Sequence, residues 1–528
     1  MASRRISRCL GVAAALTCAA GAAAAIELSA AERAGKRIFL EGRSATGSSI
    51  AARVGAGDTA IPGMVVPCAN CHGADGRGRR EGGVRPSDIT WRRLATPYGQ
   101  RLESGREHPA YDPAGLARAV TSGVDPGDNR LDPAMPRFAM SARDLADLTT
   151  YLKRLEDDRD PGLLEDVLRL GTLQPASGPL AGLGATVAAV LRGAIDGVNA
   201  DGGIHGRRVE LVVADAGRDA AAGEAALRRL VEEDKVFAVL APLAPALDGR
   251  FGELADAAHI PLIGPLAHLS DGGGRFVFDP LPGLGDQLGA LGEYAATTLR
   301  LGNPPAAIVH PDDSRSGGLA AALAERLGRR GWTQVRAYAY RPGAFDAAEV
   351  GAALAGQGAK AVFFVGGDID FGALATHASL QKASPWLFAA ATQVGPAALR
   401  LPPAQAERVF IAYPTLPQDW SPQGVGLLRA MRESSGVGDR HPAFQVEAYA
   451  AAIVMVEGLK RAGRDASRDK LVAALENLHG FRTGLTPAIG FGPGRRVGAP
   501  GAHIVAVDAQ RRAFRPTGRY VRLDTKQE

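Results

Sequence analysis

Cys68, Cys71 and His72 have the spacing Cys-x-x-Cys-His, which can attach a porphyrin to a protein chain. Two thiols three positions apart can form thioether bonds to the two vinyl groups of one haem, and the adjacent histidine then supplies an axial nitrogen to the iron. A redox-active dithiol is the alternative chemistry for this spacing. Cys68 and Cys71 are the only cysteines beyond residue 25, so no further thiol there competes for a disulfide. The spacing therefore predicts one covalent haem c, with His72 as an axial ligand.

Two helices are expected to hold this site. Residues 30–40 have an amphipathic pattern, and Ser29 is a suitable N-cap. A second helix is predicted after Ser141, because apolar side chains recur at helical spacing. They are Leu145, Leu148, Tyr151, Leu152 and Leu155. With the haem motif between these helices, residues 26–156 resemble a monohaem class I cytochrome c, an all-α domain in which the first and last helices pack together.

The resemblance implies a sixth iron ligand, usually a methionine on the loop before the last helix. Met135 is followed by Pro136 and Phe138, which is similar to the family's Met-Pro-x-Phe segment, and the proline restricts the backbone that holds the sulfur. Met140 adjoins the helix cap, where packing in the core is the expected role. We expect Met135 to bind the iron, with Met140 as the alternative. Because His/Met ligation leaves no open coordination position, it favours electron transfer over chemistry on a substrate.

Polar residues after the haem motif are candidates for contact with the haem propionates. Trp91 has an indole N–H that can donate to a propionate, and His108 is expected to be an exposed surface residue. The basic side chains have three possible roles: propionate neutralisation, docking of an acidic partner, or simple solvation. They are Arg77, Arg79, Arg80, Arg92 and Arg93.

The N-terminus has the pattern of a secretory signal peptide. Basic residues precede an apolar run at residues 10–20, and small residues lead to a cleavage site near Ala25. We therefore expect residues 1–25 to be removed on export to the periplasm. Three arginines of this segment contribute to a net charge of +5, so the remaining chain is close to neutral. Near-neutral charge and an aromatic content of 5% do not favour a nucleic-acid partner.

The charged segment 157–166 contains Pro161-Gly162 and is predicted to be a linker. Beyond it, residues 167–528 alternate strand and helix patterns, which is typical of an α/β fold with parallel sheets. Expected strands are 167–173, 209–214, 236–240, 306–310, 361–365, 387–391 and 409–413, and expected long helices end near residue 199 and span 247–258, 317–329 and 445–462.

The turn Asn199-Ala200-Asp201-Gly202-Gly203-Ile204-His205-Gly206-Arg207 gives this region its clearest resemblance. It is similar to the Asn-x-x-Gly-Gly-Ile-x-Gly-Arg turn of type I periplasmic binding proteins, in particular the branched-chain amino acid and amide receptors of ABC importers. The resemblance extends to about residue 510. It implies two α/β lobes joined by crossing strands, with a cleft that closes on a ligand.

The expected ligand site departs from that of the amino acid receptors. Where the family has a serine that holds a carboxylate, this chain has Ala241-Pro242, and His268 stands near an expected threonine. A standard α-amino acid is therefore not the expected ligand. Polar residues at strand ends are the candidates, because open α/β sheets bind ligands there. They are His268, Asp312, Asp313, Ser316, Asp368, Thr392, Tyr413 and Glu447.

These patterns predict an exported cytochrome that transfers single electrons and is coupled to a small-molecule-binding or partner-docking domain. The alternative is a solute-binding or sensory receptor of the ABC-transporter type with an accessory haem domain. If the protein were an enzyme acting at the haem, the iron would have to lack its sixth ligand from the protein. The expected partners are a redox protein, such as a periplasmic quinoprotein dehydrogenase or an oxidase, a small-molecule ligand, and an ABC permease in the alternative.

Overall fold

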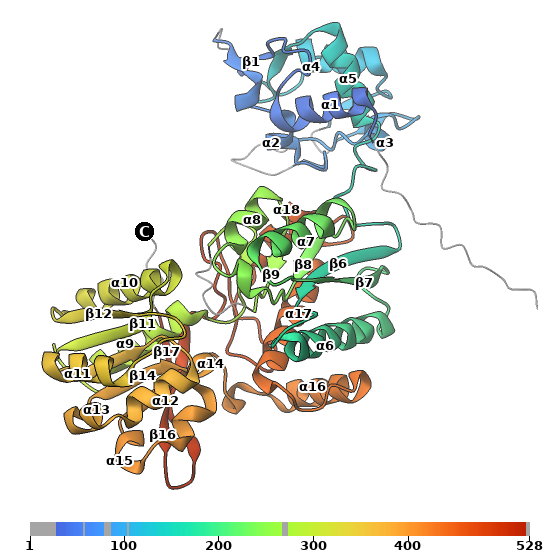
Figure 1. The fold of residues 1–528 in the computed structure, drawn as a ribbon. Helices are drawn as coiled ribbons and strands as arrows, with labels where there is room; N and C mark the ends of the chain where they lie inside the picture. Colours follow the sequence, from blue (N-terminus) through green and yellow to red (C-terminus); the bar gives the residue numbers. More distant parts are fainter. Residues whose placement is uncertain (1–27, 56–58, 79–85, 103–104, 267–272, 524–528) are drawn as a thin grey trace, which may run out of the picture. The chain divides into compact units, whose positions relative to one another are not determined.

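The computed structural model describes residues 28–55, 59–78, 86–102, 105–266 and 273–523. The predicted signal peptide and the candidate residue His268 lie outside the described residues. The chain divides into two compact units, Met1–Arg159 and Asp160–Glu528 (Figure 1).

The first unit is mainly helical, with short strands that the sequence patterns do not predict. Its helices are α1 (Ala30–Glu41), α2 (Cys68–His72), α3 (Trp91–Leu94), α4 (Pro113–Ser122) and α5 (Ala142–Leu152), with the 3-10 turn η1 (Gly63–Val65). Its strands are β1 (Ala51–Arg53), β2 (Ile61–Pro62), β3 (Gln100–Arg101), β4 (Glu107–His108) and β5 (Arg137–Ala139). Strands pair antiparallel in the orders β2-β1-β5 and β3-β4.

Helices α1 and α5 pack against each other, which confirms the predicted contact between the first and last helices. Ser29 caps α1 through a capping box with Glu32, and Ser141 caps α5. The rings of Phe39 and Tyr151 meet across the contact at 5.7 Å between centroids. At Gly35 a Cβ atom would lie 2.0 Å from the backbone oxygen of Asp147. The two helices therefore approach more closely than any side chain at that position would allow.

The second unit has two lobes. Lobe 1 has a parallel sheet in the order β10-β9-β8-β6-β7. Its strands are β6 (Val167–Gln174), β7 (Arg208–Asp215), β8 (Ala238–Leu240), β9 (Leu262–Ile263) and β10 (Val277–Phe278). Its helices are α6 (Ala181–Ala200), α7 (Ala220–Glu232), α8 (Phe251–Ala257), α16 (Pro422–Ser435), α17 (Pro442–Ala462) and α18 (Arg468–Glu476), with η2 (Pro245–Leu247).

Among the described residues, α6 is the helix that is long and apolar enough to cross a membrane. Its length and composition alone meet that test, which buried core helices also pass. In this fold α6 packs against β6, β7, α16 and α17, as a core helix does.

Lobe 2 has a sheet in the order β12-β11-β13-β14-β15-β16-β17. Its strands are β11 (Ala306–Pro311), β12 (Val335–Tyr340), β13 (Ala361–Phe364), β14 (Trp386–Ala390), β15 (Val409–Tyr413), β16 (Gly501–Asp508) and β17 (Ala513–Arg522). Its helices are α9 (Leu284–Thr297), α10 (Ser314–Arg329), α11 (Ala347–Gln357), α12 (Asp368–Thr376), α13 (Ala378–Ala383), α14 (Ala391–Val394) and α15 (Pro403–Ala406), with η3 (Gly395–Arg400). The turn η4 (Pro417–Asp419) lies between β15 and α16.

The sheet of lobe 2 is mixed, whereas the sequence pattern predicts parallel sheets. Strands β12 to β15 run parallel, but β16 pairs antiparallel with β15 and with β17. Strands β16 and β17 follow each other through a short turn, and only antiparallel neighbours can be joined by so short a connection. The prediction of a parallel sheet is wrong at this edge. Parallel neighbours need a crossover that usually contains a helix, and no such crossover lies between β16 and β17.

Successive residues on the strands of lobe 2 belong to two different hydrophobic cores, one on each face of the sheet. Ile308 and Phe363 pack with α9 and α10, whereas Val309 and Phe364 pack with α11 and α12. Successive side chains of a strand point to opposite faces, so both faces of this sheet are covered. The near-continuous apolar runs along the strands follow from that arrangement.

The predicted linker 157–166 is divided between the two units. Asp158 accepts from Tyr151 Oη at 2.8 Å and pairs with Lys36 Nζ at 2.8 Å, all within the first unit. Asp160 accepts from the backbone N–H of Arg468 at 2.6 Å, within lobe 1. Each side of the Arg159–Asp160 boundary is therefore held by its own unit.

Candidate functional site

A cavity of about 780 Å³ lies inside the first unit. Helix α2 contributes Cys68, Cys71 and His72 to its lining, and the loop before β5 contributes Met135. The remaining lining is largely apolar. It includes Phe39, Val66, Leu94, Leu116, Val120, Phe138, Leu148 and Leu152.

The residues around this cavity fit a covalently bound haem. Its volume lies within the roughly 300–1,000 Å³ typical of ligand and cofactor sites. The donor set is two thiols for the vinyl groups, one imidazole and one thioether for the iron, and apolar walls for the porphyrin face.

His72 is oriented by a hydrogen bond on its Nδ1 side. Its Nδ1 lies 2.9 Å from the carbonyl oxygen of Ser87. When Nδ1 donates to that oxygen, Nε2 keeps the lone pair that binds a metal. Burial lowers the pKa of His72, while the bond to Ser87 opposes the shift. Burial therefore favours the neutral imidazole, which is the form that coordinates iron.

The thiol environment does not match that of a redox-active dithiol. Burial raises the pKa of Cys68 to about 12. Reactive dithiols need a thiolate at neutral pH, usually with a lowered pKa. Cys68 therefore stays protonated where a redox cysteine would ionise, and attachment of a cofactor is the better explanation of the pair.

The methionines of the first unit differ in their surroundings. Met135 lines the cavity, while Met140 packs against the apolar core that contains Leu148 and Tyr151. Met64 is 49% exposed and is not part of the cavity lining. Met135 is therefore the methionine placed to meet a group bound in the cavity.

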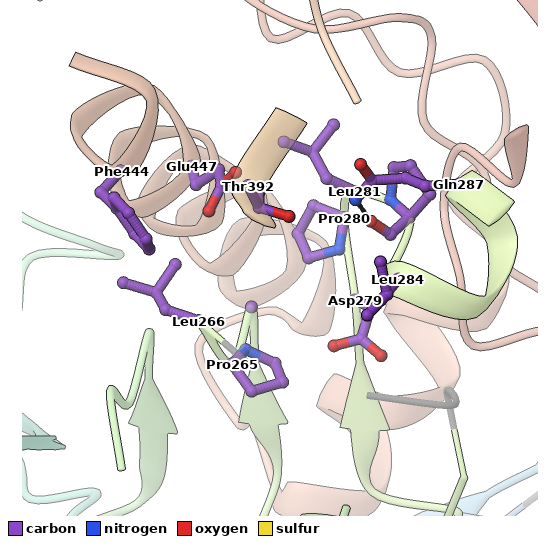
Figure 2. Close-up of a pocket in the computed structure, with 13 residues that line it drawn as sticks. Pro265, Leu266, Asp279, Pro280, Leu281, Leu284, Gln287, Thr392, Phe444 and Glu447 are labelled. Carbon is purple, nitrogen blue, oxygen red and sulfur yellow. Dashed lines mark hydrogen bonds between the residues drawn. The ribbon is translucent and has the colours of Figure 1, made fainter. Parts of the chain in front are cut away.

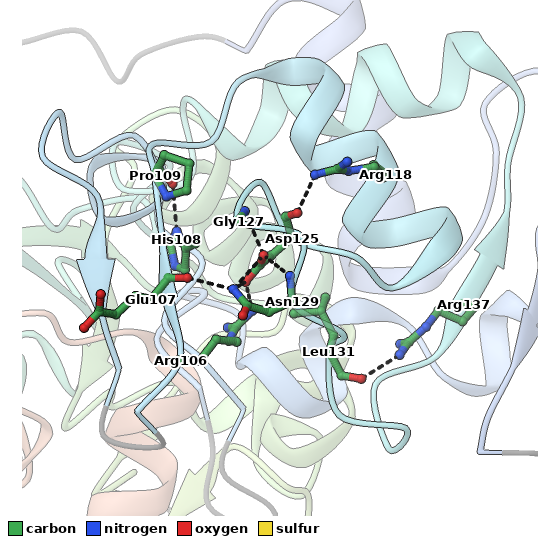
Figure 3. A network of polar contacts seen from close by, with 10 residues as sticks. All are labelled: Arg106, Glu107, His108, Pro109, Arg118, Asp125, Gly127, Asn129, Leu131 and Arg137. Carbon is green, nitrogen blue, oxygen red and sulfur yellow. Dashed lines mark hydrogen bonds and ion pairs between the residues drawn. The ribbon is translucent and has the colours of Figure 1, made fainter.

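A polar network at the cavity wall was not predicted from the sequence (Figure 3). The carboxylate of Asp125 is fully buried and accepts from Arg106 Nη1 at 2.8 Å and from the backbone N–H groups of Gly127 and Asn129. Arg106 and Asn129 also line the cavity. Arg106 and Arg130 are the described arginines of the lining, and a guanidinium can donate to a propionate.

The described candidates for propionate contact lie outside the cavity lining. Arg77, Arg92 and Arg93 are exposed and are not part of the cavity lining, and Arg79 and Arg80 lie outside the described residues. The Nζ atom of Lys153 lies 5.0 Å from the ring centroid of Trp91.

His108 is a correction to the sequence analysis, which expected an exposed residue. It is 7% exposed, lines the cavity and packs edge-on against Tyr111. Strand β4 turns its side chain inward, and a two-residue strand gives too short a pattern to show which face is buried.

A second candidate site lies between the two lobes of the second unit, with a cavity volume of about 50 Å³ (Figure 2). Lobe 1 contributes the ends of β9 and β10 and one side of α17, and lobe 2 contributes α9 and α14. The lining residues with side chains are Pro265, Leu266, Asp279, Pro280, Leu281, Pro282, Leu284, Gln287, Thr392, Phe444 and Glu447.

Glu447 is the most perturbed group of this pocket. Its side chain is partly buried on α17, and it makes no hydrogen bond or ion pair with any described residue. Desolvation is the cause of a pKa raised from 4.5 to about 7. Among the residues that the structure describes, no cation therefore compensates the charge of this carboxylate.

Thr392 and Glu447 are the predicted ligand residues that line this pocket. The other described candidates lie outside its lining. Asp313 caps α10 and accepts from Ser316 Oγ at 2.8 Å, Asp312 is exposed beside it, and Asp368 begins α12. Tyr413 ends β15, and its ring packs against Phe514.

Three pocket residues were missed. Asp279 follows β10, so the rule that ligands bind at strand ends could have found it. Phe444 lies three positions before Glu447 and shares its helix face. Gln287 gives no such signal, because it stands inside a helix with many apolar neighbours.

Two sequence families match this chain. The periplasmic binding protein family matches residues 167–511, and the cytochrome c family matches residues 65–156. An "Amino acid binding protein" of Pseudomonas aeruginosa is 28% identical over 207 residues, which are 38% of this chain and 54% of that protein. The match thus spans about half the length of that relative. A "Leu/Ile/Val-binding protein homolog 3" of Brucella melitensis is 22% identical over 59% of this chain and 83% of its own length.

Solved structures show the same fold for the second unit. A fatty acid ABC transporter substrate-binding protein from Thermomonospora curvata has a TM-score of 0.56 at 19% identity and covers 69% of this chain and 95% of its own. A branched-chain amino acid ABC transporter protein from Thermus thermophilus, with bound valine, also has a TM-score of 0.56, at 18% identity. The match covers 69% of this chain and 97% of that protein. The predicted fold class is confirmed: a cytochrome c domain precedes a two-lobed α/β fold.

Proposed function

Because this chain belongs to the periplasmic binding protein family and carries a cytochrome c domain, we propose that it is an exported single-electron carrier coupled to a small-molecule-binding domain. The cytochrome c domain implies a covalently bound haem c, and both families imply a periplasmic location. Our proposal adds a single haem, removal of residues 1–25 on export, and electron transfer as the activity.

The observation that carries this proposal is the set of residues brought to one cavity. Cys68 and Cys71 would attach the haem through thioether bonds, and His72 and Met135 would bind its iron, since all four line this cavity. When bound, haem c supplies a one-electron iron couple. The apolar lining would exclude water from the haem, and with His72 and Met135 both bound to the iron no position would be left there for a substrate.

Replacement of the methionines tests the axial assignment. The protein is expressed with its export signal and haem-attachment machinery, and its ferric form is examined by near-infrared absorption. We expect Met135→Ala to lose the sulfur-to-iron charge-transfer band and Met140→Ala to keep it. Loss of the band in Met140→Ala alone would refute the assignment of Met135. A denaturing mass without one covalent haem would refute the proposal as a whole.

The second unit supports a binding role for the other half of the molecule. Its pocket is built from both lobes, which is the arrangement that lets a two-lobed protein close on a ligand. The proposed partners are a small molecule other than a standard α-amino acid, and a redox protein of the periplasm such as a quinoprotein dehydrogenase or an oxidase.

A receptor that serves an ABC permease is the second candidate function, since the two solved structures named above are described as ABC transporter proteins. Native mass spectrometry distinguishes the two. A small molecule that is released on denaturation, together with transport that survives loss of the haem, would favour the receptor. Loss of electron transfer to a periplasmic acceptor in Met135→Ala would favour the carrier.

A further inference from the structure

The pocket between the lobes presents hydrogen-bond acceptors at several points. Gln287 is 3% exposed, its Nε2 donates to the carbonyl oxygen of Pro282, and its Oε1 has no partner among the described residues. Glu447 brings a carboxylate without a hydrogen bond or ion pair to any described residue, and Asp279 brings a second carboxylate. The described lining contains no lysine, arginine or histidine.

Such a lining is electrostatically complementary to a positive charge. An unpartnered buried acceptor and an uncompensated carboxylate both cost free energy in the empty pocket. A ligand that donates hydrogen bonds and carries a positive charge removes both costs. A carboxylate ligand would instead face the like charge of Glu447, in keeping with Ala241-Pro242 where the family has a serine.

The rest of the lining sets the size and polarity of the ligand. Leu266, Leu281, Leu284 and Phe444 form apolar walls beside the carboxylates. A cavity of about 50 Å³ has room for a few heavy atoms, since one water needs on the order of 10–15 Å³ by the same measure. Described residues contain no group of three or more His, Cys, Asp or Glu suited to a metal ion. The apolar walls also favour an organic cation over a metal ion.

We propose that this pocket binds the ammonium group of a small organic cation, with Glu447 as its counterion and Gln287 Oε1 as a hydrogen-bond acceptor. The proposal rests on the binding role of the second unit and names the class of ligand for it. Electron transfer by the first unit does not depend on it.

Titration calorimetry with the full haem-containing protein tests the ligand class. The probes are propylammonium, propan-1-ol and propanoate, which share one carbon chain and differ in the charge of the head group. We expect propylammonium to bind about tenfold to a hundredfold more tightly than propan-1-ol, because a hydrogen bond to a charged group is worth that much. Propanoate is expected to bind most weakly. Equal or tighter binding of propanoate would overturn the proposal, as would no binding of any probe.

Glu447→Gln tests the residue. This change keeps the size of the side chain and removes the charge, and we expect it to weaken propylammonium about tenfold or more while propan-1-ol changes little. Glu433→Gln on α16 is the matched control, since Glu433 is exposed and outside the pocket lining. An unchanged affinity in Glu447→Gln would overturn the assignment, and so would tight binding of Ca²⁺ or Mg²⁺ that depends on Glu447.

The pH profile is an independent measurement. Since desolvation holds the pKa of Glu447 at about 7, affinity for propylammonium is expected to fall as the pH is lowered through that value. Asp279 is the other titratable group of the described lining. In Glu447→Gln the affinity for propylammonium should no longer depend on pH in this range. A profile that persists in this variant would assign the titration to another group and overturn the role of Glu447.

The variant is expected to fold. Desolvation penalises the charged form of Glu447, so the neutral amide removes a cost that the folded protein bears above pH 7. The haem spectrum separates the two proposals. Failure of propylammonium to bind to protein with an intact haem spectrum would refute the ligand class and leave the electron carrier standing. A protein without covalent haem would refute the electron carrier whatever the binding result.

Discussion

Asp125 is fully buried and Glu447 is partly buried, and their surroundings also differ. Asp125 accepts hydrogen bonds from a guanidinium, a side-chain amide and two backbone N–H groups. Glu447 has no such partner among the residues described, and its pKa is raised to about 7. A buried carboxylate that is fully hydrogen bonded contributes to the fold, whereas a perturbed carboxylate without described partners in a pocket is a candidate for ligand binding.

Asp125→Ala is expected to destabilise the first unit by about 3 kcal/mol, because it removes the carboxylate that pairs with the partly buried Arg106 and accepts from two backbone N–H groups. The measurement is denaturant unfolding of the haem-containing protein, followed by haem absorption. Glu107→Ala is the control, since Glu107 pairs with Arg101 at the surface and should change the stability by less than about 1 kcal/mol. Similar losses in both variants would contradict this account of the network.

The contact between α1 and α5 sets the geometry of the first unit. The two helices meet at Gly35, where the backbone oxygen of Asp147 occupies the space a Cβ atom would need. Residues of both helices, including Phe39, Leu148 and Leu152, continue from this contact to the cavity wall. A change in the helix spacing therefore reaches the haem site.

Gly35→Ala is expected to destabilise the first unit by about 1–3 kcal/mol, although alanine is the better helix former, because the added methyl forces the helices apart. Thermal unfolding measures the loss. Arg37→Ala on the exposed side of α1 should stay within about 0.5 kcal/mol of the parent. A stabilised Gly35→Ala protein would show that the helices move apart without cost.

The helices that the sequence predicts best are those with local signals. Ser29 and Ser141 cap their helices as expected, and the apolar spacing after Ser141 gives the buried face of α5. The pairing of β16 with β15 has no local signal, because the partners lie about a hundred residues apart and pair antiparallel in a mainly parallel sheet. The sequence motif likewise predicts the proposed haem ligands on α2, since they are adjacent, whereas Gln287 and Glu447 come to line one pocket only in the folded chain.

At the scale of the whole molecule, the two units have separate hydrophobic cores. The core around Ile38, Phe39 and Leu148 belongs to the first unit, and the other cores belong to residues beyond 160. Separate cores allow separate unfolding, because few interactions have to be lost together.

Calorimetry of the full protein is expected to show at least two unfolding transitions. Asp125→Ala should lower the midpoint of one of them. Leu475→Ala removes a fully buried side chain of lobe 1 and should lower the midpoint of another, through a loss of about 2–5 kcal/mol. A single transition that both variants shift alike would show that the units unfold together.

In the export proposed above, the order in which the chain leaves a membrane channel would have different consequences for the two units. The first unit is one continuous run of residues and can fold and accept its cofactor as soon as that run has emerged. The core of lobe 1 combines residues 163–278 with residues 428–491, and all of lobe 2 up to β15 lies between them in the chain. Lobe 1 therefore stays incomplete until nearly the whole polypeptide has crossed, and during that time its apolar strands need protection by chaperones.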